Sequence, residues 1–185
     1  MRKLTSMLLA GAVAFSALAT SAYADNPMVG GAAMYADKNI VENAVNSKDH
    51  TTLVAAVKAA GLVETLQGAG PFTVLAPVNS AFDALPAGTV DTLLKPENKD
   101  QLTKVLTCHV VGADAMSDAI GKMIADDGGT HPVNTVGGCV LQAKMDGDKI
   151  TLTDENGTVA TVTIADVDQS NGVIHVIDKV LTPKA

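Results

Sequence analysis

Four histidines are the side chains in this sequence best suited to acid–base or metal chemistry: His50, His109, His131 and His175. A metal centre needs three or four converging ligands, and no two histidines have the H-x-x-x-H spacing that places a pair on one helix face. His109 falls on the apolar stripe of an expected helix, and His175 lies within a β-branched strand. We therefore expect both to be hydrogen-bonded core residues. His50 begins an expected element and His131 precedes a proline, so we expect these two to be exposed.

Patterns for hydrolysis, phosphate binding and calcium binding are also incomplete. The sequence has no G-x-S-x-G nucleophile elbow and no glycine-rich phosphate loop after a strand. Asp166, Asp168 and Ser170 match the first three ligand positions of an EF-hand loop. However, Asn171 stands where glycine is needed, and Ile177 stands where a bidentate glutamate is needed. The sequence therefore predicts no catalytic residue, no metal site and no cofactor, and an enzyme is the least favoured class.

The N-terminus has the features of a secretory signal. Arg2 and Lys3 precede an apolar stretch over residues 8–18, and Ala22-Tyr23-Ala24 matches the A-x-A pattern of signal peptidase sites. We predict that residues 1–24 form a bacterial Sec-type signal peptide, cleaved between Ala24 and Asp25. The apolar stretch is too short for a transmembrane anchor, and no run of about 18 apolar residues follows it. A periplasmic or extracellular product without an integral membrane segment is expected.

Two cysteines, Cys108 and Cys139, remain in the expected mature chain. An exported chain meets an oxidising compartment, where an even pair of cysteines indicates a disulfide. Closing a loop of roughly 30 residues stabilises the fold by about 3–4 kcal/mol in the chain-entropy description. A redox-active or metal-binding pair is the alternative, but the two cysteines lack the C-x-x-C spacing that it favours.

The charge of the mature chain excludes one class of partner. Removal of residues 1–24 leaves 161 residues with 11 basic and 20 acidic side chains, a net charge of −9. Nucleic-acid binding requires clustered Lys and Arg that displace counterions, so we expect no nucleic-acid partner. The length is that of one domain with a sizeable core.

The periodicity of apolar residues predicts mainly helices in the first two thirds of the chain and strands in the last third. Residues 25–36 are rich in glycine and alanine and indicate a flexible lead-in. Apolar stripes with helical spacing follow, and we expect helices over 40–45, 51–66, 80–85, 89–94, 97–109 and 116–124. The expected N-caps are Asn39, Asn79 or Ser80, and Thr89.

The last third of the chain alternates between apolar and polar β-branched residues. This period of two predicts strands over 133–136, 140–145, 149–153, 159–167 and 173–180, after an earlier strand over 72–75. Asp146-Gly147 and Asn156-Gly157 provide hairpin turns between them. Helices followed by an antiparallel meander define an α+β chain of one domain.

Two strings in this framework resemble the signatures of the fasciclin (FAS1) domain. The first is FTVLAPVNSAF, from Phe72 to Phe82, and the second is GVIHVIDKVL, from Gly172 to Leu181. Between them, TCHVV over residues 107–111 resembles the Tyr-His motif of the family. The motif positions, which we interpret as structural, are Phe72, Thr73, Ala76, Pro77, Asn79, Phe82, His109, Ile174, His175, Val176, Ile177 and Asp178.

The resemblance covers residues 37–183, and two residues depart from it. It implies a fasciclin-like fold in which N-terminal helices pack on an antiparallel sheet or sandwich formed mainly by the C-terminal half. Val78 stands where the family usually has threonine, and Cys108 stands in place of the tyrosine of the Tyr-His motif. Any adhesive contact that depends on that tyrosine is therefore absent from this chain.

The resemblance also implies a function. Fasciclin domains are generally extracellular cell-adhesion modules, found in animal matrix proteins, plant arabinogalactan proteins and secreted bacterial proteins, including mycobacterial antigens and symbiosis-related proteins. We therefore expect an adhesion or interaction module that contacts an unidentified surface protein or glycan. The alternative is a periplasmic carrier of a small or apolar ligand, held in a groove between helices and sheet. Met116, Met123 and Met145 are candidates to line that groove.

Overall fold

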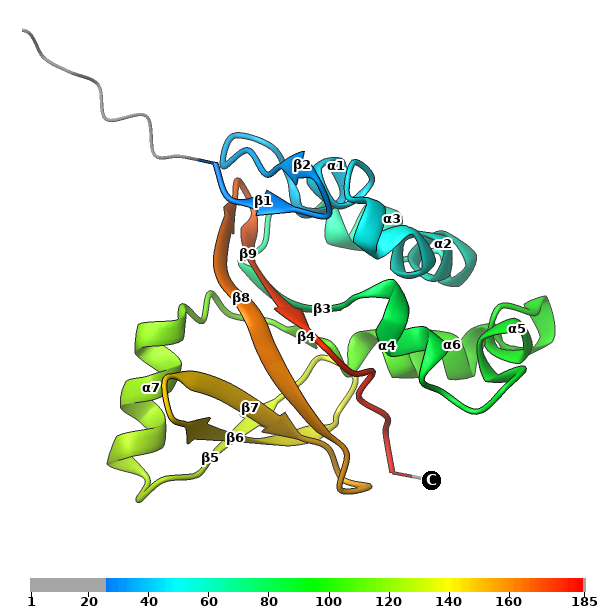
Figure 1. Ribbon diagram of the computed structural model, residues 1–185. Helices are drawn as coiled ribbons and strands as arrows, with labels where there is room; N and C mark the ends of the chain where they lie inside the picture. Colours follow the sequence, from blue (N-terminus) through cyan, green and yellow to red (C-terminus); the bar gives the residue numbers. More distant parts are fainter. Residues whose placement is uncertain (1–25, 185) are drawn as a thin grey trace, which may run out of the picture.

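The computed structural model of the chain describes residues 26–184 (Figure 1). The expected signal peptide and its cleavage point between Ala24 and Asp25 lie outside the described residues. Within residues 26–184, every helix is too short or too polar to cross a membrane.

A mixed sheet of seven strands forms the centre of the fold, in the order β4-β3-β9-β8-β7-β6-β5. Neighbouring strands are antiparallel except β3 and β9, which run parallel with Phe72 opposite Gly172 and Pro77 opposite Ile177. The strands are β3 (Phe72–Pro77), β4 (Val110–Val111), β5 (His131–Asn134), β6 (Val140–Asp146), β7 (Lys149–Thr153), β8 (Val159–Gln169) and β9 (Gly172–Ile177). The two strands that carry the fasciclin-like strings are therefore direct neighbours.

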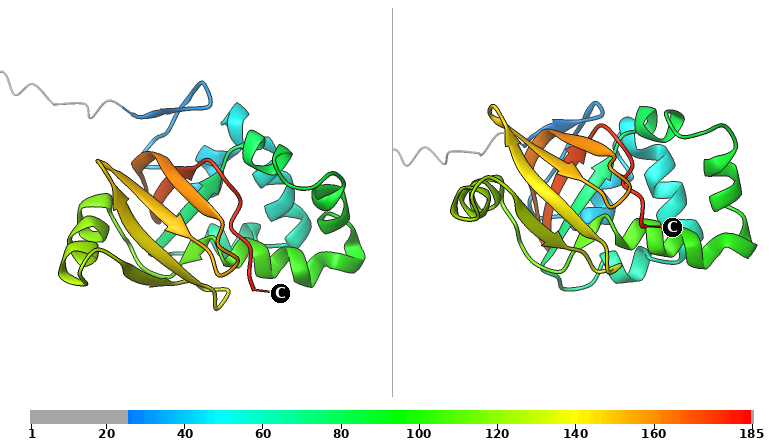
Figure 2. Two further views of the ribbon diagram at one scale, coloured as in Figure 1. Left: turned by 60° about the horizontal axis from the view of Figure 1, so that its bottom comes forward. Right: turned by 90° about the horizontal axis from the view of Figure 1, so that it is seen from below.

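Most helices lie on one side of this sheet, as Figures 1 and 2 show. They are α1 (Ile40–Ala44), α2 (Thr51–Ala60), α3 (Val63–Leu66), α4 (Asn79–Asp83), α5 (Thr89–Leu93) and α6 (Lys99–Thr107), with short 3-10 turns η1 (Lys48–His50) and η2 (Pro96–Asn98). Helix α7 (Ser117–Asp126) lies apart from them and packs on β5 and β6. The helical layer therefore covers only part of the sheet.

Alternation along β3 and β9 separates two hydrophobic cores. Val74 and Ala76 of β3, with Ile174 and Val176 of β9, face the helical layer. Leu75 and Ile177 point the other way, into a second core enclosed by β6, β7, β8 and α7. Because both faces of these two strands are buried, their sequence is apolar almost throughout.

The sheet curls until its two edges approach one another. Strand β8 is eleven residues long and contains register shifts between Val162 and Val167, which allow it to bend. Beyond β5, the Val136 amide donates to the Val110 carbonyl oxygen of β4 at 2.7 Å. The Gly137 amide likewise donates to the Thr107 carbonyl oxygen at 2.9 Å. These bonds bring the two edge strands together and give the sheet the form of a partly closed barrel.

The expected flexible lead-in over residues 25–36 differs from the structure. Strands β1 (Met28–Val29) and β2 (Ala32–Ala33) form a hairpin around Gly30 and Gly31, whose φ angles are 59° and 77°. A Gly-Gly pair favours a tight hairpin turn because both residues readily adopt positive φ. The high glycine and alanine content of the segment had instead been interpreted as a sign of flexibility. Val29 and Met34 are buried in the helical core, and this burial holds the segment in place.

Two of the expected helix caps are also wrong. Asn39 caps α1 as expected, and Glu42 completes a capping box with it. In contrast, α4 begins at Asn79 with Val78 at the N-cap, and α5 begins at Thr89 with Gly88 at the N-cap. The side chains of Asn79 and Thr89 therefore lie one position too late to cap their own helices.

Candidate functional site

The two cysteines are joined at the point where the sheet edges meet. Cys108 follows α6, Cys139 precedes β6, and their Cα atoms are 5.3 Å apart in a disulfide that spans 31 residues. Both residues are buried, and the bond reinforces the neighbouring contacts of Val136 and Gly137. Its position fits a structural bond, because reductants and metal ions have no direct access to the sulfur atoms.

His109 lies directly beside this disulfide, just beyond the end of α6 and not on the helix as expected. Its Nδ1 lies 2.8 Å from the Val105 carbonyl oxygen, and its Nε2 accepts a hydrogen bond of 2.9 Å from the Leu181 amide. Burial lowers the pKa of His109 to about 4, although the Val105 carbonyl and Asp154 act in the opposite direction. The neutral ring therefore connects α6 with the C-terminal segment, and it has no free atom for catalysis.

His175 and Thr73, from the two fasciclin-like strings, hold one loop in place. The His175 Nε2 lies 2.7 Å from the Ala115 carbonyl oxygen, and its Nδ1 accepts from the Asp166 amide at 3.2 Å. The Thr73 hydroxyl donates to the Ala113 carbonyl at 2.6 Å and accepts from the Ala115 amide at 2.9 Å. Both side chains therefore fix the segment that leads into α7.

Asn79 connects two helices. Its Oδ1 accepts from the Thr52 amide at 3.0 Å and from the Thr51 hydroxyl at 3.2 Å, and its Nδ2 donates to the Lys48 carbonyl at 2.8 Å. Asn79 thus caps α2 from a distance of 27 residues in sequence, although it is the first residue of α4. Its role in the string is to join α4 to the start of α2.

His50 is buried, contrary to the expectation that it would be exposed. Its Nδ1 lies 2.8 Å from the Ser47 hydroxyl and its Nε2 3.4 Å from the Ala76 carbonyl oxygen. Burial lowers the pKa of His50, so the neutral ring is favoured. His50 belongs to η1, and its ring lies against Ala76 of β3, a contact of which the local sequence carries no sign.

Two buried polar residues, Asn171 and Asn43, join distant parts of the backbone, and the sequence had not predicted this role for them. Asn171, in the turn between β8 and β9, accepts from the Ile40 amide and donates to the Leu66 and Gly68 carbonyl oxygens. Asn43 of α1 is fully buried, where it bonds both the amide and the carbonyl of Tyr35. The sequence did contain a sign of the Asn43 site, because Asn43 is an asparagine on the otherwise apolar face of a helix.

Among residues 26–184, no group of three His, Cys, Asp or Glu side chains converges as a metal site would require. Asp166 instead uses its carboxylate to accept from the Ser117 amide at 2.7 Å, and it also bonds the Ser117 hydroxyl. This contact anchors the first residue of α7.

His131 pairs with Asp127 at 2.6 Å between Nδ1 and Oδ2, and its side chain is 23% exposed.

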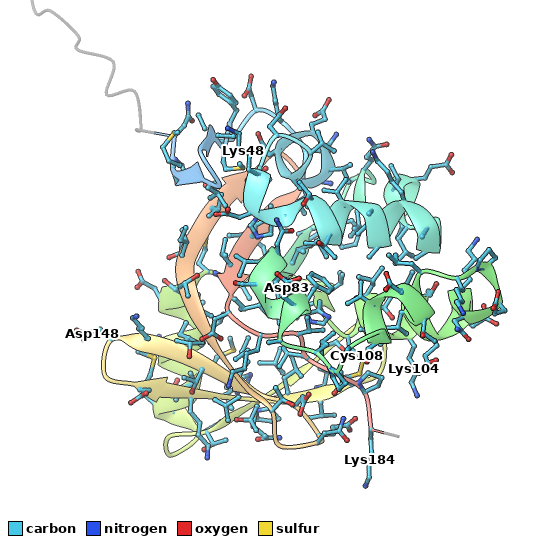
Figure 3. The ribbon with its side chains drawn as sticks, turned by 45° about the vertical axis from the view of Figure 1, so that its right-hand side comes forward. Lys48, Asp83, Lys104, Cys108, Asp148 and Lys184 are labelled. Atoms are coloured by element: carbon cyan, nitrogen blue, oxygen red, sulfur yellow. A yellow bond between two sulfur atoms is a disulfide. The ribbon has the colours of Figure 1, made fainter. Side chains whose placement is uncertain are left out.

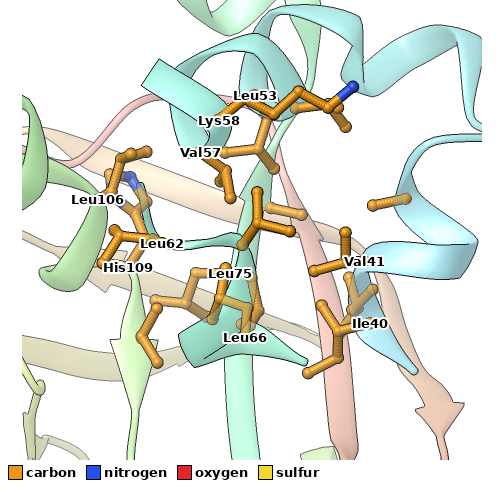
Figure 4. A pocket seen from close by; sticks show the side chains of 17 residues that line it. Ile40, Val41, Leu53, Val57, Lys58, Leu62, Leu66, Leu75, Leu106 and His109 are labelled. Carbon is orange, nitrogen blue, oxygen red and sulfur yellow. The ribbon is translucent and has the colours of Figure 1, made fainter. Parts of the chain in front are cut away.

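Two hollows remain as candidate sites for a ligand. An apolar crevice of about 40 Å³ lies between α1, α2, α3 and the sheet, and Figure 4 shows Ile40, Leu53 and Leu66 around it. A larger cavity of about 270 Å³ opens at the mouth of the curled sheet beside α7. Of the three methionines expected to line a groove, Met123 borders the larger cavity, whereas Met145 is exposed.

Charged side chains are dispersed over the outside of the molecule. Figure 3 labels Lys48, Lys104 and Lys184, which lie on three separate parts of the surface, whereas Cys108 lies inside.

Comparison with known proteins connects these features to one family. Residues 48–183 match the model of a protein family described as "Fasciclin domain". Protein sll1483 of Synechocystis is 51% identical over 78% of this chain and 73% of its own length. Immunogenic protein MPB70 of Mycobacterium bovis is 32% identical over 98% of this chain and 95% of its own.

Larger proteins contain related segments. Transforming growth factor-beta-induced protein ig-h3 of Sus scrofa is 38% identical over 72% of this chain, which spans only 17% of that protein. A solved FAS1 domain pair from the insect cell adhesion molecule fasciclin I superposes with a TM-score of 0.53 at 23% identity, over 70% of this chain and 43% of that one. This superposition shows a shared fold. Because the family match spans most of the sequence and relatives exceed 30% identity over most of it, the chain belongs to the fasciclin domain family.

Proposed function

We propose that this chain is an exported adhesion or interaction module that contacts a surface protein or glycan and catalyses no reaction. In this proposal residues 1–24 are a signal peptide, the mature chain begins at Asp25, and residues 37–183 form the functional domain. The mature protein resides in the periplasm or outside the cell.

Membership of the fasciclin family carries the proposal, because its solved structures include a domain pair from an insect cell adhesion molecule. The side chains of the fasciclin-like strings support a role as scaffold. Thr73, His109 and His175 use their polar atoms in bonds within the chain. Recognition of a partner is therefore expected on the outer surface and not at these residues.

The exposed apolar side chains give that surface two regions to test. Met28, Tyr35 and Val45 belong to the N-terminal hairpin and α1, whereas Val136 and Val159 lie on the curled sheet and its loops. Met and Tyr are enriched at protein interfaces, and Tyr is enriched among the residues that contribute most of the binding energy. A pair of surface variants, one in each region, can therefore locate a binding face without disturbing the core.

The decisive experiment measures binding of purified residues 25–185 to cells, matrix proteins and a glycan array. We expect binding above that of an equally acidic control protein, and a loss of binding in either Met28→Ser/Tyr35→Ser or Val136→Ser/Val159→Ser. Retained folding of both variants is checked by circular dichroism. Absence of binding in all three formats, or turnover of ester or glycan substrates, would contradict the proposal. N-terminal sequencing of the exported protein tests the cleavage before Asp25.

A carrier role in the crevice of Figure 4 has weaker support. The crevice encloses only about 40 Å³, whereas cavities that hold drug-sized ligands enclose roughly 300–1,000 Å³. The crevice is therefore best explained as an imperfectly filled boundary between helices and sheet.

A further inference from the structure

The cavity at the mouth of the curled sheet is distinct from the crevice under the helices. It encloses about 270 Å³, and β3, β4, β5, β7, β8, β9 and α7 all contribute to its wall. Most of that wall is apolar, with Leu75, Val111, Ile120, Met123, Val133 and Leu152 among its side chains. Mouths of small barrels are common places for small-molecule sites.

The size of the cavity fits a small molecule. In a different protein, an engineered apolar cavity of about 150 Å³ stays dry and binds benzene. The cavity here encloses about 270 Å³, so one aromatic ring with a short substituent fits in it. A ligand much larger than two fused rings does not.

Most polar atoms of the wall already have partners within the chain. The Thr73 hydroxyl bonds Ala113 and Ala115, and the two ring nitrogens of His175 bond Ala115 and Asp166. These groups therefore offer little to a ligand. Lys, Arg, Asp and Glu are missing from the residues that line the cavity, so an ionised ligand would lose its hydration without gaining a partner.

His131 and Asn134 of β5 also line the cavity and have side-chain polar atoms without a partner among the described residues, and of the two only His131 is partly buried. All four residues of β5 border the cavity, and burial alternates along the strand: His131 and Val133 are partly buried, whereas Pro132 and Asn134 are exposed. The Asp127 carboxylate accepts from the His131 Nδ1 at 2.6 Å, which places the proton of the neutral ring on Nδ1. The Nε2 of the neutral ring is then a hydrogen-bond acceptor, and it has no partner among the described residues.

We propose that this cavity binds a small neutral phenol or alcohol, whose apolar body lies against Leu75, Ile120 and Leu152 and whose hydroxyl donates to the His131 Nε2. Asp127 acts as a positioning residue because it fixes the tautomer that makes Nε2 an acceptor. This binding site does not depend on the adhesive function, since it lies inside the sheet.

The test uses two probes of nearly equal shape, p-cresol and p-xylene, with residues 25–185. Dissociation constants are measured by calorimetry, and chemical-shift changes in NMR spectra locate the bound probe. Both probes are expected to bind and to shift the signals of Leu75, Ile120 and Leu152. In His131→Leu the affinity for p-cresol should fall about three- to tenfold, the range expected for one hydrogen bond, while that for p-xylene stays within about twofold.

Two further variants distinguish the contribution of the apolar cavity to probe binding from that of the His131 acceptor. Val133→Phe fills the cavity and should abolish binding of both probes, whereas Lys144→Phe, on an exposed position of β6 outside the cavity wall, should leave both unchanged. The proposal is overturned if wild-type protein binds neither probe, if Val133→Phe retains binding, or if His131→Leu weakens both probes equally. His131 lies on an edge strand and is partly exposed, so His131→Leu remains an informative folded variant even if Val133→Phe fails to fold.

Discussion

His109 connects the disulfide region to the C-terminal segment as a neutral ring. Because Nε2 accepts from the Leu181 amide, a proton on Nε2 would replace an attraction with a repulsion between two donors. Burial lowers the pKa in the folded state, while the unfolded chain retains the ordinary value of 6.5. The unfolded state therefore binds more protons than the folded state below that value, and stability is lost as the pH falls from about 6.5 toward 4.

We predict that the free energy of unfolding falls by about 2 kcal/mol between pH 7 and pH 5 through His109 alone. His50, whose pKa is also lowered by burial, acts in the same direction. Urea denaturation at several pH values measures the effect. His109→Gln should be less stable at pH 7 but should show a flatter pH dependence. Equal slopes in His109→Gln and the wild type would show that this ring is not the cause.

Asn79 gives a second prediction at the scale of single residues. Asn79→Ala removes the acceptor for the Thr52 amide and the donor to the Lys48 carbonyl. Loss of such a cap costs about 1–2 kcal/mol, measured by chemical denaturation. Asn134→Ala is the matched control, because Asn134 is exposed on the edge strand β5, and it should change stability by less than about 0.5 kcal/mol. A similar loss in both variants would contradict the capping role.

Among the elements, β3 and β9 are the most constrained, because they pair in parallel and separate the two cores. Their first residues are opposite one another, with Phe72 beside Gly172. Gly172 has a φ of 150°, and a Cβ atom there would overlap the Phe72 carbonyl oxygen. The close approach of the two strands therefore requires glycine at this position.

We predict that Gly172→Ala costs more than about 3 kcal/mol or prevents folding, since neither backbone can move without breaking the pairing. Gly147→Ala is the control. Gly147 also has a positive φ, of 60°, but no atom lies within 4 Å of an added Cβ. It should cost only about 1 kcal/mol. If both variants lower the melting temperature equally, the requirement for glycine at position 172 comes from its backbone conformation and not from the contact between the strands.

At the scale of the whole molecule, closure of the curled sheet depends on a few contacts between its edges. The Cys108–Cys139 bond lies at this seam, together with the Val136–Val110 and Gly137–Thr107 hydrogen bonds. The helical core on the far face of β3 and β9 makes its own contacts. Loosening the seam is therefore expected to affect the second core and the cavity more than the helical layer.

Replacing both cysteines by alanine tests this expectation. The variant should lose about 3–4 kcal/mol of stability, as expected for a loop of this length. Hydrogen exchange should increase at β4, β5 and β6, while α1 and α2 serve as an internal reference. A uniform increase over the whole chain would show instead that the two cores open as one unit.

Local patterns in the sequence determined much of this structure. Alternation marked β6, β7 and β8, and Asn39 marked the start of α1, whereas the single helix expected over 51–66 is divided at Gly61 into α2 and α3. The two strings identified the family, which the comparisons confirmed. These features depend on residues a few positions apart, so their signal is present in a single chain segment.

Tertiary structure alone decided which strands pair and which polar residues are buried. The pattern that predicts strands does not specify a partner, so the parallel pairing of β3 with β9 was unforeseen. His50 was expected on the surface because its contact with Ala76 of β3 joins residues 26 positions apart. The cavity next to His131 likewise forms only where the curled sheet meets α7. Each of these features depends on contacts between distant segments, which local periodicity does not encode.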